Sequence, residues 1–218
     1  MSLQQELDDF MAGVRTQVPA EVLAPIEHFY ATELHAPGRF PNVLREGHLA
    51  PLFELPDAFG QDVRLDTLLQ QGPVVLSFYR GAWCPFCNLE LRALQKVLPE
   101  LKALGASLVA VSPELPDYSL PMVQRNGLEF PVLTDRGNAV ARQFGIVFAL
   151  EGEIRRISLE VFQVDLPKFN GDQSWDLPVP ATFVIAPDRT VRLAFFDPEF
   201  RHRVEPQAVV DAVRSAVR

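Results

Sequence analysis

Two cysteines separated by two residues, Cys84 and Cys87, are the residues of this sequence best suited to chemistry. They are the only cysteines in the chain. A cysteine thiolate, not the thiol, is the nucleophile in reactions at sulfur. A second cysteine three residues away can attack the sulfur that reacted first and close a disulfide. The pair therefore predicts reversible thiol–disulfide chemistry.

A buried strand and a helix are predicted to position the two cysteines. The apolar and β-branched run at 72–79 favours a strand, and leucines at near-helical spacing after the pair favour a helix. Proline is favoured at the first helical position, so Pro85 would begin this helix and Cys84 would be its N-cap. The unpaired N–H groups and the helix dipole would then favour a thiolate at Cys84.

Zinc binding and inert burial are two other interpretations of the cysteine pair. A structural zinc site needs four protein ligands. The chain has no further cysteine, and its four histidines are scattered, at His28, His35, His48 and His202. The strand and the proline around the pair argue against inert thiols. We therefore expect redox chemistry with no metal and no bound cofactor.

Residues 78–87, Phe-Tyr-Arg-Gly-Ala-Trp-Cys-Pro-Phe-Cys, resemble two related patterns. The part from Trp83 to Cys87 is similar to the thioredoxin-type active site. The phenylalanine–tyrosine pair followed by Cys87 is similar to the peroxiredoxin pattern, with Cys84 at its threonine position and Cys87 at its peroxidatic position. From about residue 44 onward the chain resembles the peroxiredoxin-like branch of the alkyl hydroperoxide reductase/thiol-specific antioxidant (AhpC/TSA) family.

This resemblance implies an α/β, thioredoxin-like fold with a central mixed sheet flanked by helices. Residues 1–43 would form an N-terminal helical extension, and residues 44–218 the thioredoxin-like domain with an insertion at about 147–177. The implied function is a thiol-dependent peroxidase that reduces hydrogen peroxide or organic hydroperoxides. A thioredoxin-like donor would recycle its disulfide.

A second functional element is expected at Val179-Pro180-Ala181-Thr182, which opens a predicted strand. It resembles the loop that carries a cis proline beside the cysteine pair in thioredoxin-fold proteins. On that resemblance the Val179–Pro180 bond is cis, and Pro180 presses against the disulfide. The Val179 backbone would then remain free to pair with an incoming extended chain.

The sequence departs from typical peroxiredoxins in its cations. Typical peroxiredoxins place an arginine near the loop just described, and this chain has Pro180 at that position. Their peroxidatic motif also contains a proline, and this chain has Arg80 in its place. Arg80 has two interpretations, a cation for the thiolate or a solvated arginine at a strand end, and both remain open. The supporting residues of the candidate site are Trp83, Pro85, Arg80, Val179, Pro180 and Thr182.

The rest of the chain is predicted to alternate between strands and helices. Residues 2–30 carry two apolar helical stripes, which could pack on the main domain or on a second subunit. The insertion should hold a helix around 150–161 and a loop at 168–172. The other expected elements are a strand at 107–112, a helix at 117–126, a strand at 130–135, a helix at 138–144, a hairpin at 182–196 and a closing helix at 206–217.

The composition of the chain limits the kinds of partner that it could bind. The formal net charge is −8 and no lysine or arginine cluster is present, which argues against nucleic acid. No apolar run approaches membrane-spanning length, and the first residues do not resemble a signal peptide. We therefore expect a cytoplasmic protein. The family resemblance implies a peroxide substrate and a thioredoxin-like reductant, and a homodimer is one assembly that the sequence allows.

Two alternatives to the peroxidase remain. In a protein disulfide reductase, Cys84 would attack a substrate disulfide and Cys87 would release it. In a redox sensor, the disulfide would switch a partner surface. Physical reasoning favours Cys84 as the first nucleophile, because an N-cap sulfur faces free N–H groups and should be the more exposed of the two.

The first prediction is that Cys84 and Cys87 form a reversible disulfide. Mass spectrometry after peroxide treatment should show the loss of two hydrogens in a peptide that links the two cysteines. Reduction with a dithiol should restore the mass. Free thiols that persist under strong oxidant would contradict the prediction.

Overall fold

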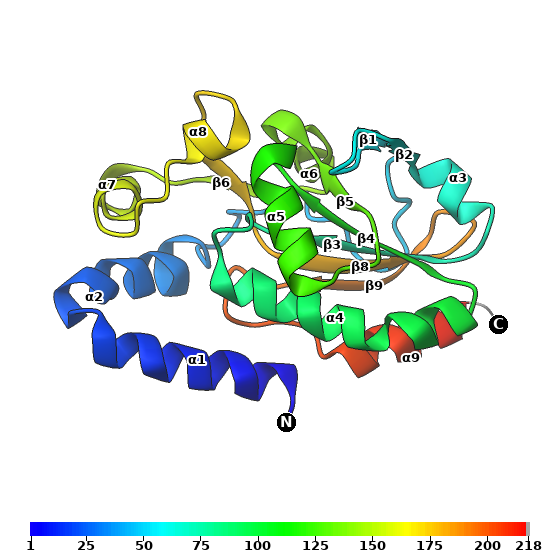
Figure 1. Cartoon of the computed structure of the whole chain (residues 1–218), viewed down its shortest axis with the longest axis horizontal. Coiled ribbons are helices and arrows are strands. Elements are labelled where there is room, and N and C mark those ends of the chain that lie inside the picture. Colours follow the sequence, from blue (N-terminus) through cyan, green and yellow to red (C-terminus); the bar gives the residue numbers. More distant parts are fainter. Residues whose placement is uncertain (217–218) are drawn as a thin grey trace.

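A five-stranded sheet forms the middle layer of the protein, as a computed structural model of the chain shows (Figure 1). The structure describes residues 1–216. The strand order is β5-β4-β3-β8-β9, and β3 pairs parallel with β4 and antiparallel with β8. This arrangement is the mixed sheet that the sequence predicts. The strands are β3 (Val74–Phe78), β4 (Ser107–Ser112), β5 (Val132–Thr134), β8 (Ala181–Ile185) and β9 (Val191–Phe196).

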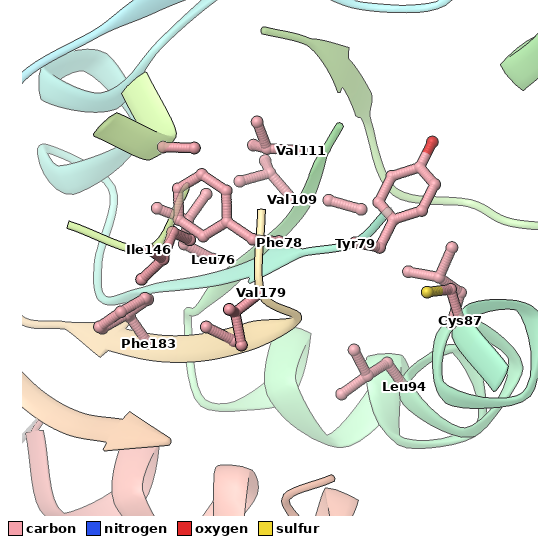
Figure 2. Close-up of a cluster of buried hydrophobic side chains, with 14 of the residues drawn as sticks. Leu76, Phe78, Tyr79, Cys87, Leu94, Val109, Val111, Ile146, Val179 and Phe183 are labelled. Atoms are coloured by element: carbon pink, nitrogen blue, oxygen red, sulfur yellow. The ribbon is translucent and has the colours of Figure 1, made fainter. Parts of the chain in front are cut away.

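Strand β3 is the centre of the sheet because both of its faces are covered. All five of its residues are buried, as the continuous apolar run in the sequence predicts. The ring of Phe78 lies 5.0 Å from that of Phe144, which lies 4.9 Å from that of Phe183. Figure 2 shows this apolar cluster around Leu76 and Phe78, with Cys87 and Tyr79 at its edge. The end of β3 therefore brings the sheet directly to the cysteine pair.

Two helices pack side by side against the sheet, α4 (Pro85–Ala103) and α9 (Pro206–Ala216), and a third, α1 (Leu3–Gln17), lies along α4 (Figure 1). Helix α4 continues through Pro99, and Gly105, with φ +73°, follows its end. Val217, the end of the predicted closing helix, lies outside the described residues. Outside the N-terminal extension and the insertion, the remaining helices are α3 (Leu65–Leu69), α5 (Pro116–Asn126), the 3-10 turn Arg136–Asn138 and α6 (Ala139–Gln143).

The N-terminal extension packs on the main domain, which answers the question that the sequence left open. It consists of α1, α2 (Ala20–His28) and a π-helical turn, Phe29–Glu33. Leu7 of α1 and Tyr30 of the π-helical turn are buried in the same core as the sheet. The carboxylate of Glu205 accepts hydrogen bonds from the first N–H groups of α1, at Leu3 (3.0 Å) and Gln4 (2.9 Å). A carboxylate is favoured there by the helix dipole.

The insertion is an arm whose two ends pair with each other. Strands β6 (Val147–Ala149) and β7 (Asp176–Pro178) are antiparallel and enclose α7 (Gly152–Glu160) and α8 (Leu166–Asn170). Helix α7 confirms the expected helix. The loop predicted at 168–172 is wrong for residues 168–170, which belong to α8, and correct for 171–172. The Asp165 side chain caps the Lys168 N–H, and Gly171 ends α8 with φ +68°. A small hairpin, β1 (Glu54–Pro56) and β2 (Asp62–Arg64), lies at the β5 edge of the sheet, where Asp57 forms a bridge with Leu133.

No helix of the described residues is long and apolar enough to cross a membrane. The proposed domain boundary near residue 43 stays a prediction, because the extension and the sheet share one apolar core.

The second prediction concerns the centre of this core. Leu76→Ala should lower the free energy of unfolding by about 3 kcal/mol, because it removes fully buried methyl groups and leaves a cavity. Leu49→Ala is the control, since Leu49 is 60% exposed, and should change stability by less than about 0.5 kcal/mol. Urea unfolding followed by circular dichroism measures both. Equal effects would contradict the packing described here.

Candidate active site

Cys84 is the N-cap residue of α4, as the sequence predicts, and Pro85 is the first residue of the helix. The backbone N–H of Cys87 donates to Cys84 Sγ at 3.4 Å. The strand and the helix thus place the sulfur over the free N–H groups of the first turn. This position favours negative charge on Cys84 Sγ.

Arg80 supplies a full positive charge to the same sulfur. Its Nη2 donates to Cys84 Sγ at 3.0 Å, and its Nη1 donates to the hydroxyl of Tyr30 at 2.9 Å. The side chain is buried, and its guanidinium lies 4.1 Å from the ring centroid of Phe200. The interpretation of Arg80 as a solvated residue is therefore wrong, and the structure supports the interpretation as a cation for the thiolate.

The two cysteines differ in charge. Burial raises the pKa of Cys84, but a hydrogen bond from Cys87 and the charges of Arg80 and Arg203 outweigh it and lower that pKa to about 5. Burial and the neighbouring Cys84 sulfur raise the pKa of Cys87 well above its usual value. The reduced site therefore holds a thiolate at Cys84 and a thiol at Cys87 near neutral pH.

Both sulfurs are fully covered, which corrects one expectation. Cys84 is not the more exposed cysteine, because both side chains are 0% exposed. The ring of Phe200 lies over Arg80 and packs against the rings of Tyr30 and Phe86, with distances between ring centroids of 4.5 Å and 5.1 Å. Tyr30 comes from the N-terminal extension, so residues far apart in the sequence close the site together.

The turn between β3 and α4 is held by buried polar groups. Glu114 accepts a hydrogen bond from the Ala82 N–H at 2.8 Å, and burial raises the pKa of Glu114 to about 7. The side chain of Asn88 donates to the carbonyls of Ala82 and Cys84, both at 2.8 Å. Gly81 has φ +152°, and a Cβ there would collide with the indole of Trp83. These contacts fix the backbone on which the two sulfurs stand.

The loop before β8 differs from the expectation. No peptide bond in the described part of the chain is cis, so the prediction of a cis Val179–Pro180 bond is wrong. The N–H of Val179 donates to the carbonyl of Ile146 at 2.8 Å, and Val179 is fully buried. The pairing of β6 with β7 ends at this bond and occupies the N–H that was expected to be free for an incoming chain.

Two functional candidates escaped the sequence reasoning, Arg203 and Glu90. Arg203 Nε donates to Glu90 Oε2 at 2.6 Å, and Arg203 Nη2 lies 3.8 Å from Cys87 Sγ. The hydroxyl of Thr182 donates to Glu90 Oε1 at 3.4 Å. A signal existed for Glu90, since a glutamate one helical turn after Cys87 falls on the apolar face of α4. Arg203 lies in the connection between β9 and α9, outside any periodic pattern, and carries no such signal.

A hollow of about 330 Å³ lies beside the first turn of α4. Trp83, which is half-buried, and Pro85, which is exposed, form part of its wall, so it reaches the residues on either side of Cys84. Its remaining lining residues are Phe10, Ala82, Asn88, Leu89, Arg92, Arg125 and Asn126. Among the described residues no group of three or more histidine, cysteine, aspartate or glutamate side chains is arranged to hold a metal ion.

Comparisons with known proteins agree with this geometry. The chain is 32% identical over 122 residues to a putative peroxiredoxin of Mycobacterium tuberculosis, covering 56% of this chain and 79% of the relative. It is 34% identical over 106 residues to the thiol-disulfide oxidoreductase ResA of Halalkalibacterium halodurans, covering 48% of this chain and 59% of the relative.

A similar solved structure is that of the peroxidoxin BcpB from Mycobacterium tuberculosis. Its TM-score is 0.61 at 26% identity, and the match covers 79% of this chain and 97% of that one. The model of the AhpC/TSA family matches residues 47–194, which is more than half of the chain. With the fold and the cysteine pair described above, this match shows that the chain belongs to the AhpC/TSA family.

Proposed function

We propose that the protein is a thiol-dependent peroxidase that reduces hydrogen peroxide or organic hydroperoxides. The observation that carries this proposal is the contact of 3.0 Å between the Arg80 guanidinium and Cys84 Sγ in a buried site. A peroxidase needs a thiolate at neutral pH and a cation nearby. Membership of the AhpC/TSA family and the peroxiredoxin relatives support the same reaction.

Cys84 begins the proposed reaction. Its thiolate attacks one peroxide oxygen, the O–O bond breaks, and the other oxygen takes up a proton and leaves as water or an alcohol. Cys84 becomes a sulfenic acid. Cys87 then attacks Cys84 Sγ, a disulfide forms, and the sulfenic oxygen leaves as water. A dithiol donor of the thioredoxin type reduces the disulfide and restores both thiols.

Access to Cys84 requires movement of its cover. Both sulfurs are 0% exposed, so a peroxide reaches them only when groups around the site move. The Phe200 ring, which lies over Arg80, and the first turn of α4 are the nearest candidates for this movement. The hollow at Trp83 and Pro85 offers a place for a small hydroperoxide to bind near the site, although Cys84 itself does not line it. A small substrate needs a smaller opening than a protein does.

The second candidate function is a protein disulfide oxidoreductase, which the similarity to ResA favours. Two features of the site oppose it. The Val179 N–H is already bonded to Ile146, and the Cys84 sulfur is covered. A protein disulfide would have to reach this sulfur without that backbone contact. A redox sensor, the third possibility, would turn over slowly in assays of both activities.

The partners of the peroxidase belong to the same proposal. We expect a thioredoxin-like protein as reductant and a cytoplasmic location, with a homodimer as the assembly to be tested. Size-exclusion chromatography with light scattering measures the oligomeric state.

The third prediction separates the candidate functions. Stopped-flow mixing of the reduced protein with hydrogen peroxide and with an organic hydroperoxide should show rapid oxidation, because Cys84 is a thiolate at neutral pH. The insulin-reduction assay should show little activity. The Cys84→Ser/Cys87→Ser protein is the control. Fast insulin reduction with slow peroxide oxidation would favour the disulfide oxidoreductase.

The fourth prediction assigns the first nucleophile. Cys84→Ser should lose fast peroxide consumption, whereas Cys87→Ser should keep it and stall as a sulfenic acid, since a serine hydroxyl can still donate to Cys84 Sγ. The thiolate fraction follows the pKa of about 5 at Cys84. The rate constant of the first step should therefore stay level above about pH 6 and fall as the pH drops through 5. An ordinary thiol would still gain rate up to about pH 9.

Wild-type rates of sulfenic acid formation on Cys87 in the Cys84→Ser protein would reverse this assignment. Cys87 would then be the peroxidatic residue, as the alignment with the peroxiredoxin pattern implies.

A further inference from the structure

A buried ion pair lies beside Cys87. Arg203 Nε donates to Glu90 Oε2 at 2.6 Å, and the two residues are 4% and 1% exposed. Burying two charges costs desolvation free energy, and their mutual attraction often does not recover it. An apolar pair of similar size would fill the same space at no such cost. The charges therefore indicate a role besides stability.

The guanidinium of Arg203 is fixed so that one nitrogen faces the sulfur. Its Nη1 donates to the carbonyls of Phe200 and His202, and its Nε is bonded to Glu90. The nitrogen left over, Nη2, lies 3.8 Å from Cys87 Sγ. Thr182 donates to the other oxygen of Glu90 at 3.4 Å, which holds the carboxylate in turn. The two arginines thus make their short contacts with different sulfurs, Arg80 with that of Cys84 and Arg203 with that of Cys87, while the charge of each acts on both.

We propose that Arg203 stabilises the thiolate of Cys87 when that thiolate attacks the oxidised Cys84, and that Glu90 is the positioning residue for its guanidinium. The chemical step rests on the proposed peroxidase function. Cys87 loses its proton, its Sγ bonds to Cys84 Sγ, and the S–O bond of the sulfenic acid breaks. The departing hydroxide combines with the released proton to give water.

Oxidation of Cys84 changes the charge balance in favour of this step. In the reduced site the negative Cys84 sulfur disfavours a second thiolate at Cys87. The sulfenic acid is neutral, so this repulsion disappears while both guanidinium groups remain. The charged and titratable groups that surround Cys87 are Cys84 and Glu90 on α4, Tyr79 and Arg80 at the end of β3, Glu114 after β4, and Arg203 before α9.

A titration of Cys87 tests the proposal without any peroxide. In a Cys84→Ser background Cys87 is the single thiol, and the ultraviolet absorbance of its thiolate reports its pKa. The Cys84→Ser/Cys87→Ser protein is the blank that removes tyrosine ionisation. Adding Arg203→Met should raise the pKa of Cys87 by about one unit, because an opposite charge is lost. Adding Glu90→Gln should lower the pKa, because Arg203 is then no longer neutralised.

The opposite directions of the two pKa shifts distinguish a charge effect from a loosened core, because a loosened core would shift the pKa of Cys87 in the same direction in both variants. Arg201→Met is the matched control, since Arg201 lies in the same segment, pairs with Glu199 and should leave the pKa unchanged. Shifts of equal sign, or no shift with Arg203→Met, would overturn the proposal. If the Arg203→Met protein does not fold, the double variant Arg203→Met/Glu90→Met is compared with the single variant Glu90→Met. Equal pKa values of Cys87 in these two proteins would also overturn the proposal.

Kinetics in the wild-type background separate this proposal from the peroxidase function. At pH 8, where Arg80 and the helix N-terminus still hold Cys84 as a thiolate, Arg203→Met should slow disulfide formation more than the first step with peroxide. The expected loss in disulfide formation is about tenfold, which is the effect of one pKa unit on the thiolate fraction of Cys87. A sulfenic-acid probe should then trap Cys84. Resolution at the wild-type rate would reject the role of Arg203 in the step. Absence of any sulfenic acid would reject the peroxidase, while the titration would still decide the effect of Arg203 on Cys87.

Discussion

The contact between the Arg80 guanidinium and the Cys84 sulfur is the interaction on which the site depends. A lone charge in a dry interior is costly, and either group alone would be strongly destabilised there. Together, at 3.0 Å and at the end of a helix, they hold a thiolate within the core of the protein. The turn that joins them is fixed in turn by Glu114 and Asn88. The fold therefore combines an apolar sheet with a small cluster of buried charged groups.

Local signals made the centre of this structure predictable. The apolar run of β3, the proline after Cys84 and the leucine spacing of α4 act over a few residues, and the strand, the N-cap and the helix all lie where the sequence places them. The helix α8, where a loop was predicted, also had local signals, because Asp165 and Gly171 are ordinary start and stop residues of a helix.

The contacts that could not be predicted join distant parts of the chain. Tyr30 lies 50 residues from Arg80, and Arg203 lies 116 residues from Cys87. No periodicity or spacing links such pairs, since only the complete fold brings them together. The error at Val179–Pro180 has the same origin. The insertion returns as a strand pair whose last hydrogen bond uses the Val179 N–H, and a comparison of short motifs does not contain that information.

The complete burial of the two sulfurs, beside Arg80 and the Tyr30 and Phe200 rings that pack on it, has a kinetic consequence. A reactive group with no exposed surface meets its substrate only during the fraction of time in which the cover is displaced. Turnover at high substrate concentration would then approach the frequency of that motion instead of rising with each collision. The same enclosure admits compact oxidants more readily than bulky ones. Tyr30, which the N-terminal extension contributes to the site, thus ties the chemistry of the sulfur to the motion of a segment far from it in the sequence.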